Sequence, residues 1–175
     1  MNILVTGGVR SGKSRHAESL LVSYDDVTYV APGPTLQEDS DPDWVARIRA
    51  HQERRPATWT TMETRDLASA LATDGPVLVD CLGTWLTAVL DDASLWESPA
   101  EAVHAHVTDR LDAAVVALAS APGPVVLVTN EVGLGVVPEH RSGRLFRDLL
   151  GSVNQGVATA CDEVHLVVAG RVLVL

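Results

Sequence analysis

The stretch GGVRSGKS, residues 7–14, follows the short apolar run NILVT and constrains the fold more than any other part of the sequence. It fits the pattern G-x-x-x-x-G-K-[ST], in which glycines let successive backbone N–H groups point at phosphate oxygens. The helix that follows such a loop adds the positive end of its dipole. The pattern therefore predicts a phosphate-binding loop between a buried strand and a helix. A glycine-rich turn without a ligand is the alternative interpretation.

Lysine occurs once in this sequence, inside the loop, at Lys13. The 13 basic residues of the chain are otherwise all arginines. A compact ammonium group reaches between two phosphates more readily than a planar, forked guanidinium. We therefore expect Lys13 to contact the β- and γ-phosphates of a nucleotide and the Ser14 hydroxyl to hold Mg²⁺.

Composition and charge exclude several classes of protein. The net charge of −10 argues against nucleic acid as the main partner. No apolar run approaches the ~20 residues of a membrane span, and the N-terminus lacks the basic start and long apolar stretch of a signal peptide. Cys81 and Cys161 are too few for a disulfide framework or a zinc site. We expect one catalytic domain over residues 1–175, located in the cytoplasm.

Short runs rich in Val and Leu alternate with stretches of helical periodicity. Continuous apolar runs are typical of strands buried on both faces of a parallel sheet. The expected strands are residues 2–6, 27–31, 76–80, 124–130 and 163–170, with residues 171–175 as an antiparallel edge hairpin on the last. Helices are expected after the cap Asp41 and over about 99–120 and 142–160. With the phosphate loop after the first strand, this alternation predicts a three-layer α/β fold of the RecA-like P-loop NTPase class.

Ligands of open α/β sheets bind beyond the carboxyl ends of the strands. That rule places five strand-ending residues on one rim: Gly7, Ala31, Asp80, Asn130 and Glu131. A carboxylate at Asp80, after the apolar strand VLVD, can bind Mg²⁺ directly or through water together with Ser14. An aspartate that merely ends a strand is the alternative.

The segment RIRAHQERRP, residues 47–56, is the densest basic stretch of this acidic chain. Arg47, His51 and either Arg54 or Arg55 fall at i, i+4 and i+7 or i+8, on one helical face. A histidine flanked by arginines is a candidate phosphate ligand, or a nucleophile that attacks phosphorus. From spacing alone, a solvated helix face and a purely structural histidine stay open as alternatives.

Residues 129–155, TNEVGLGVVPEHRSGRLFRDLLGSVNQ, form a long polar, glycine-containing connection that runs into a helix. Glu131 follows the expected strand, and Arg141, Arg144 and Arg147 come next at i, i+3 spacing. Loops above a rigid sheet tend to carry substrate contacts. An ordinary strand-to-helix connection is the alternative interpretation of the same residues.

Five of these stretches, in this order, resemble one known family: GGVRSGKSRHAE, RIRAHQERRPATWTTME, VLVDCLGTWLT, VTNEVGLGVVPE and FRDLLGSVNQ. The family is the bifunctional adenosylcobinamide kinase / adenosylcobinamide-phosphate guanylyltransferase of cobalamin assembly, and the resemblance runs from residue 2 to about 170. It implies that ATP or GTP phosphorylates the aminopropanol hydroxyl of adenosylcobinamide. It further implies transfer of GMP from GTP to that phosphate through a guanylyl-histidine, with release of pyrophosphate. A homotrimer with sites near the subunit interfaces is also implied.

Carried over by motif, the resemblance identifies His51, in RIxxHxxRR, as the covalent nucleophile. The phosphate-loop pattern makes Lys13 the second expected catalytic residue, and the loop and the strand-ending carboxylate make Ser14 and Asp80 the expected Mg²⁺ ligands. The implied nucleotide-binding residues are Gly7, Gly8, Val9, Arg10, Ser11, Gly12, Lys13, Ser14, Ala31, Pro32, Gly33, Gln52, Glu53, Arg54, Arg55, Glu63 and Asp80.

The chain departs from the usual family sequence at two places. The family usually has Ala-Thr after the second strand, where this chain has Ala31-Pro32-Gly33, and Ala88 stands where members often carry Asn.

Two other functions stay open as alternatives. The first rival is a simple P-loop small-molecule kinase without a covalent histidine. The second is a nucleotide-regulated oligomeric module that binds GTP without turning over cobinamide.

Overall fold

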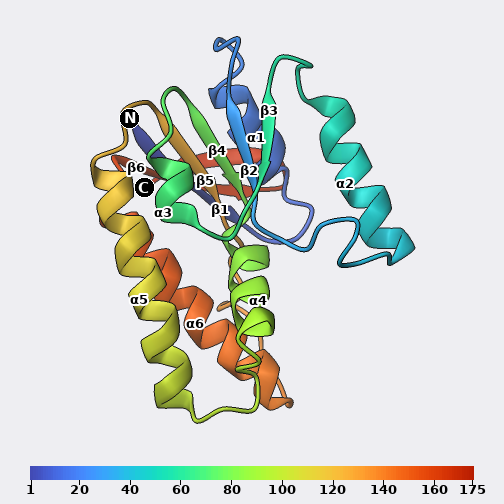
Figure 1. The fold of residues 1–175 in the computed structure, drawn as a ribbon, viewed down its shortest axis with the longest axis vertical. Helices are drawn as coiled ribbons and strands as arrows, with labels where there is room; N and C mark the ends of the chain where they lie inside the picture. The colour runs from blue at the N-terminus through green and yellow to red at the C-terminus, as the bar shows by residue number, and fades with distance from the viewer.

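The computed structural model of the chain describes residues 1–175 (Figure 1). Its strands are β1 (Asn2–Gly7), β2 (Thr28–Ala31), β3 (Thr60–Glu63), β4 (Val77–Asp80), β5 (Val125–Val128), β6 (Glu163–Val168) and β7 (Arg171–Val174). Its helices are α1 (Lys13–Leu20), α2 (Pro42–Arg54), α3 (Leu67–Leu71), α4 (Leu82–Asp92), α5 (Ala100–Ala119) and α6 (Arg141–Ala158). The strands form one sheet in the order β3-β2-β4-β5-β1-β6-β7, parallel except for β7.

Alternate residues of the central strands enter two different cores, one on each face of the sheet. Val125 and Leu127 of β5 pack into the core that α3, α4, α5 and α6 cover. Val126 and Val128 pack into a second core that includes Ala17 of α1. Because both faces are covered, every residue of β5 is buried, which explains the unbroken apolar run in the sequence. The expected three-layer α/β fold is confirmed.

Parallel pairing brings the carboxyl ends of the strands to one edge of the sheet. In the register, Asp80 at the end of β4 lies opposite Val128 of β5, and Ala31 at the end of β2 lies opposite Glu63 of β3. The backbone N–H of Glu131 donates to the carbonyl of Gly7 at 3.2 Å. The expected rim is therefore present, and Glu63 joins it from a strand that the sequence did not predict.

The C-terminal hairpin is also confirmed. Strand β7 pairs antiparallel with β6, with Val168 opposite Arg171, and the turn contains Gly170 at a φ of 75°. All four residues of β7 are exposed.

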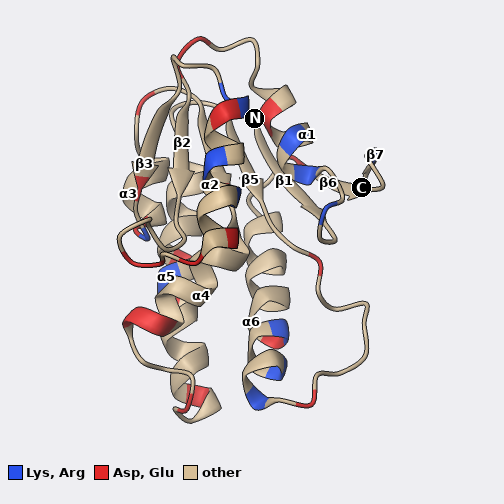
Figure 2. Cartoon of the chain, turned by 90° about the vertical axis from the view of Figure 1, so that its right-hand side faces the viewer, with Lys and Arg blue, Asp and Glu red and all other residues tan.

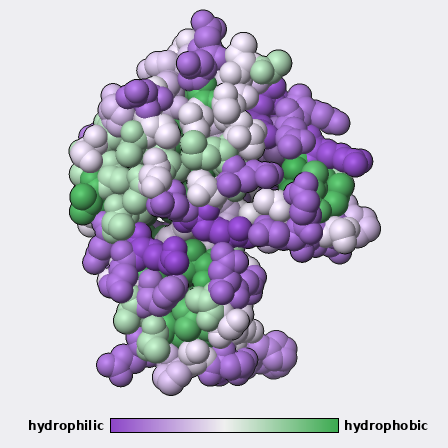
Figure 3. Space-filling view, in the orientation of Figure 1, coloured by the Kyte–Doolittle hydropathy of each residue, from purple (hydrophilic) through white to green (hydrophobic).

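Helices α4, α5 and α6 extend beyond the sheet and form a projection below the main body of the molecule (Figure 1). The space-filling view shows a hollow beside this projection, under the overhang of α2 (Figure 3). No helix combines the length and the apolar character that a membrane crossing requires.

The basic first turns of α6 lie at the far end of this projection, away from the sheet (Figure 2). Their arginines are occupied within the chain. Arg147 donates to the carbonyls of Gly133 and Gly135 at 2.7 and 2.9 Å, and Arg144 donates to that of Pro138 at 3.2 Å. Arg141 donates to backbone carbonyls in the connection between α4 and α5. In this structure the three arginines therefore bind loop carbonyl groups and do not face a cavity.

Candidate active site

The phosphate loop connects β1 to α1 and needs glycine at two positions. A Cβ atom at Gly7 would lie 2.4 Å from the carbonyl oxygen of Val167, which no side chain tolerates. Gly12 caps α1 at a φ of 96°, a left-handed conformation that favours glycine. The two glycines of the motif are thus explained by close approach in one case and by backbone conformation in the other.

Lys13 is buried at the start of α1, with 6% of its surface exposed. Its Nζ donates to the carbonyl of Gly8 within the loop at 3.2 Å. Burial lowers the pKa of Lys13 and outweighs the Asp80 carboxylate, which raises it, while the positive charge of Arg47 lowers it further. A buried ammonium group whose only hydrogen bond is to the loop itself is ready to exchange that bond for phosphate oxygens.

Helix α2 carries the predicted basic face and lies apart from both cores. Asp41 caps it, as predicted, by accepting from the backbone N–H groups of Asp43 and Trp44 at 3.0 and 3.1 Å. None of its residues is buried. An ion pair of 2.9 Å between Arg54 and Glu18 ties the helix to α1. Because α2 does not fill the space next to the sheet, a cavity remains there.

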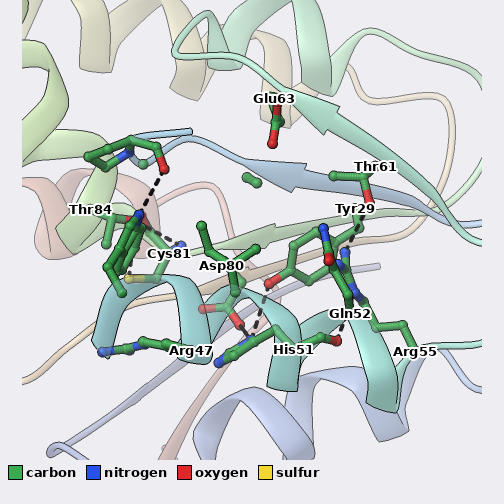
Figure 4. A pocket seen from close by; sticks show the side chains of 15 residues that line it. Tyr29, Arg47, His51, Gln52, Arg55, Thr61, Glu63, Asp80, Cys81 and Thr84 are labelled. Atoms are coloured by element: carbon green, nitrogen blue, oxygen red, sulfur yellow. Dashed lines mark hydrogen bonds and ion pairs between the residues drawn. The ribbon is translucent and has the colours of Figure 1, made fainter. Parts of the chain in front are cut away.

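This cavity lies between α2 and the carboxyl ends of β2, β3 and β4, and has a volume of about 600 Å³ including its open mouth (Figure 4). Its lining residues come from distant parts of the sequence. They are Tyr29, Ala31, Gly33, Pro34, Trp44, Arg47, Ile48, His51, Gln52, Arg55, Thr61, Glu63, Asp80, Cys81 and Thr84.

His51 meets two side chains of the sheet at the centre of the cavity (Figure 4). Its Nδ1 lies 3.5 Å from Oδ2 of Asp80 and 3.4 Å from the hydroxyl of Tyr29. The Asp80 side chain is 6% exposed, and its Oδ2 makes no regular hydrogen bond. Both contacts use Nδ1, so the other ring nitrogen, Nε2, has no partner in the chain. A neutral imidazole held in this way can offer the Nε2 lone pair to an electrophile.

The ionisation of Asp80 depends on two opposing influences. Burial by itself raises the pKa of this carboxyl group. Interactions with His51, then with the Ser14 hydroxyl and the Lys13 ammonium, outweigh burial, so the pKa lies below its ordinary value. Asp80 is therefore a carboxylate at neutral pH, close to the phosphate loop as well as to His51.

Arg55 holds the walls of the cavity together. Its guanidinium stacks on the ring of Tyr29 at 3.6 Å from the ring centre. It also donates to the carbonyl of His51 at 3.0 Å and to the hydroxyl of Thr61 at 3.3 Å. The arginine thereby links α2 to β2 and β3.

Residues 3–175 match the family model of cobinamide kinase / cobinamide phosphate guanyltransferase. The chain belongs to this family. It is 44% identical to the bifunctional adenosylcobalamin biosynthesis protein CobU of Salmonella typhimurium, with 97% of each chain covered. It is 42% identical to CobU of Escherichia coli, again over 97% of each chain, and 37% identical to CobP of Pseudomonas aeruginosa, over 97% of this chain and 94% of that protein.

Among solved structures the likeness is more distant. The flagellar accessory protein FlaH of Methanocaldococcus jannaschii is 14% identical, with a TM-score of 0.44, over 98% of this chain and 74% of that one. The P4 protein of bacteriophage phi6 in complex with ADP is 16% identical, with a TM-score of 0.45, over 98% of this chain and 53% of that one. These likenesses are too distant to bear on the function.

Membership of the cobinamide kinase / guanylyltransferase family confirms the resemblance seen in the sequence. It assigns the chain to the bifunctional transferases of cobalamin biosynthesis. The comparisons therefore do not support the second rival function, a nucleotide-regulated module without catalytic activity.

The structure brings together many, but not all, of the residues predicted for the family site. His51, Gln52, Arg55, Ala31, Gly33, Glu63 and Asp80 line the cavity. Residues 7–14 form the separate phosphate loop. Pro32 is buried but does not line the cavity, Glu53 is exposed, and Arg54 is paired with Glu18.

Sequence reasoning left other cavity residues out of the predicted site. The main ones are Tyr29 and Trp44, while Arg47 was predicted on the basic helical face but not among the site residues. Tyr29 is the aromatic residue of the expected strand VTYVA, and it combines a large apolar ring with a hydroxyl. That hydroxyl is the signal that could have marked Tyr29, because a buried hydroxyl requires a partner.

The side chains near the loop fit a Mg²⁺ ion. Asp80 offers a buried oxygen without a regular hydrogen bond, and the Ser14 hydroxyl is near enough to lower the pKa of that carboxyl group. No group of three or more His, Cys, Asp or Glu side chains forms a metal cage. Mg²⁺ that accompanies a nucleotide uses few protein ligands and completes its shell with phosphates and water.

Proposed function

We propose that this enzyme phosphorylates adenosylcobinamide with ATP or GTP and then transfers GMP from GTP to the new phosphate through His51. Family membership supports the two reactions. The observation that carries the covalent step is the placement of His51, whose Nδ1 faces Asp80 at 3.5 Å while Nε2 is free. Residues 1–175 would act as one catalytic domain.

In the kinase step, the loop N–H groups and Lys13 would bind the β- and γ-phosphates. The corrinoid hydroxyl oxygen forms a bond to the γ-phosphorus and releases its proton to the surrounding water. The bond between that phosphorus and the β–γ bridging oxygen breaks, and the nucleoside diphosphate leaves with the electron pair. Mg²⁺, held by Ser14 and Asp80, would neutralise charge on the phosphate oxygens.

In the guanylyl step, Nε2 of neutral His51 forms a bond to the α-phosphorus of GTP, and pyrophosphate leaves with the electron pair of the broken P–O bond. The proton stays on Nδ1, where the Asp80 carboxylate stabilises the charge on the ring. A phosphate oxygen of adenosylcobinamide phosphate then attacks the same phosphorus. The P–N bond breaks, its electrons return to Nε2, and adenosylcobinamide-GDP is released.

Labelling with α-³²P-GTP tests the covalent step. The wild-type protein is expected to retain a label that is labile in acid and stable in alkali, as a phosphoramidate is. His51→Ala should retain none, whereas His104→Ala, which removes an exposed histidine of α5, should label like the wild type. Equal labelling of His51→Ala and the wild type would show that His51 is not the nucleophile.

The kinase that lacks a covalent histidine predicts a different pattern. It allows phosphorylation of adenosylcobinamide but no retained label. Lys13→Ala should depress both reactions, because both use the same phosphate loop. Full activity of Lys13→Ala in either reaction would remove the loop from that reaction.

We also propose that the enzyme is a homotrimer in the cytoplasm, as the family resemblance implies. Exposed apolar side chains support an assembly, among them Leu134 and Val136, which are 90% and 95% exposed, and Val174 of β7, which is 56% exposed. Sedimentation equilibrium measures the assembly directly. A single species of one chain at micromolar concentration would contradict the trimer.

A further inference from the structure

Two arginines line the cavity, and they differ in what they bind. Arg55 is committed to Tyr29, to the carbonyl of His51 and to Thr61. The guanidinium of Arg47 makes no ion pair and no hydrogen bond within the chain, although its backbone belongs to helix α2. It lies four residues before His51, so the two side chains share one face of α2, and Figure 4 shows both below the cavity centre.

The position of Arg47 brings a second positive charge toward the phosphate loop. Its charge is one of the influences that lower the pKa of Lys13, which places the guanidinium within electrostatic reach of that ammonium group. The two cations repel each other, and the Asp80 carboxylate near Lys13 offsets part of this repulsion. An anion bound between the phosphate loop and α2 would replace this repulsion with two attractions.

The acids of the cavity do not occupy Arg47. Asp80 faces His51, and Glu63 lies on the opposite wall of the cavity, at the end of β3 (Figure 4). Neither carboxylate makes an ion pair with Arg47. Arg49, two residues on, points from another face of the helix and does not line the cavity. Both arginines are exposed, but Arg47 lines the cavity in which the proposed function places GTP, and Arg49 does not.

We propose that Arg47 is the catalytic arginine of the guanylyl step and binds the non-bridging oxygens of the α-phosphate that His51 attacks. This proposal rests on the proposed function. The guanidinium contacts the phosphate in the GTP complex and binds it more strongly as charge builds up on the phosphate oxygens during P–N bond formation. Arg54, which the sequence also offered for this role, is held by Glu18, and Arg55 is held by the cavity wall.

The test compares Arg47→Ala with Arg49→Ala, a matched control on the same helix. The first measurement is the single-turnover rate at which α-³²P-GTP labels the protein. Removal of one donor to a reacting oxyanion typically lowers a rate by about 100-fold, and we expect that loss for Arg47→Ala. The control should stay within about twofold of the wild type. Arg47→Lys keeps the charge but not the forked geometry, so it should restore the rate in part.

The second measurement is the affinity of each folded variant for GTP, by calorimetry. We expect Arg47→Ala to bind GTP about tenfold more weakly than Arg49→Ala, since a charge-assisted contact is lost. Slower labelling of Arg47→Ala supports the proposal whether or not its affinity for GTP changes. A labelling rate of Arg47→Ala equal to that of Arg49→Ala overturns the proposal, even if Arg47→Ala binds GTP more weakly.

The affinity measurement also separates this proposal from the proposed function. If the wild type gave no histidine label, the guanylyl-histidine would be wrong. Equal GTP affinity of the two variants would then overturn the Arg47 contact as well. Weaker binding by Arg47→Ala would retain Arg47 as a phosphate ligand.

Discussion

At the scale of single residues, the proposed mechanism depends on the position of the Asp80 carboxylate. Asp80 lies 3.5 Å from Nδ1 of His51, and the Ser14 hydroxyl and Lys13 ammonium also lower its pKa. The Asp80 side chain therefore interacts with His51 on one side and with the phosphate loop on the other. This shared carboxylate would allow one triphosphate site to support both reactions.

Substitution of Asp80 tests this shared role. Asp80→Asn removes the charge that stabilises a protonated His51 ring and a ligand for Mg²⁺, so both reactions should slow by about 100-fold. The pH profile of labelling should change as well, because the ring is no longer paired with a carboxylate. Asp112→Asn, an exposed change on α5, is the control. A normal rate and profile for Asp80→Asn would remove Asp80 from the mechanism.

The sequence predicted the residues of this site better than their contacts. The loop residues, His51 and Asp80 carry recognisable motifs and lie where the strand ends place them. The commitment of Arg54 to Glu18 and of Arg55 to Tyr29 depends on the angle at which α2 meets the sheet. No local pattern encodes that angle, because α2 buries no residue in a core.

At the scale of elements, apolar runs identified the buried strands but not β3. Its sequence, TTME, carries three polar residues, and three of its four positions are exposed, since β3 forms the edge of the sheet. An edge strand with one covered side lacks the Val and Leu run on which the prediction relied. Glu63 was therefore predicted from family resemblance alone and not from its place at a strand end.

A pair of histidines, one from α1 and one from β6, connects these two elements by a hydrogen bond. His16 Nε2 lies 2.8 Å from Nδ1 of His165, whose Nε2 lies 2.7 Å from Glu163. In this arrangement neutral His16 can donate to His165, which in turn donates to Glu163. Burial, followed by the charge of His165, lowers the pKa of His16 below 6.5.

This lowered pKa gives a pH dependence of stability. The unfolded chain, in which His16 titrates at about pH 6.5, binds more protons than the folded chain just below that pH. The contribution of His16 to the free energy of unfolding should therefore be fully present above pH 6.5 and be lost on acidification below it. His16→Gln should flatten this slope below about pH 6.5 in urea titrations. His104→Gln serves as the exposed control, and an unchanged slope in His16→Gln would contradict the assignment.

At the scale of the whole molecule, the projection of α4, α5 and α6 and the sheet share one core. Leu86 of α4 is fully buried in the cluster that also contains Leu127 of β5 and Leu150 of α6. Leu86→Ala should lower the free energy of unfolding by about 2–5 kcal/mol, because it leaves a cavity. Val116→Ala, at a side chain that is 70% exposed, should change it by less than about 0.5 kcal/mol. Similar losses in the two variants would show that the projection does not share the core.

The central claim is that GTP guanylylates His51 before GMP reaches the corrinoid. Mass spectrometry of the digested protein after incubation with GTP and Mg²⁺ tests it most directly. We predict a GMP adduct on the peptide that contains His51, and its disappearance when adenosylcobinamide phosphate is added. Formation of adenosylcobinamide-GDP without any adduct, or with an adduct on another residue, would contradict the account.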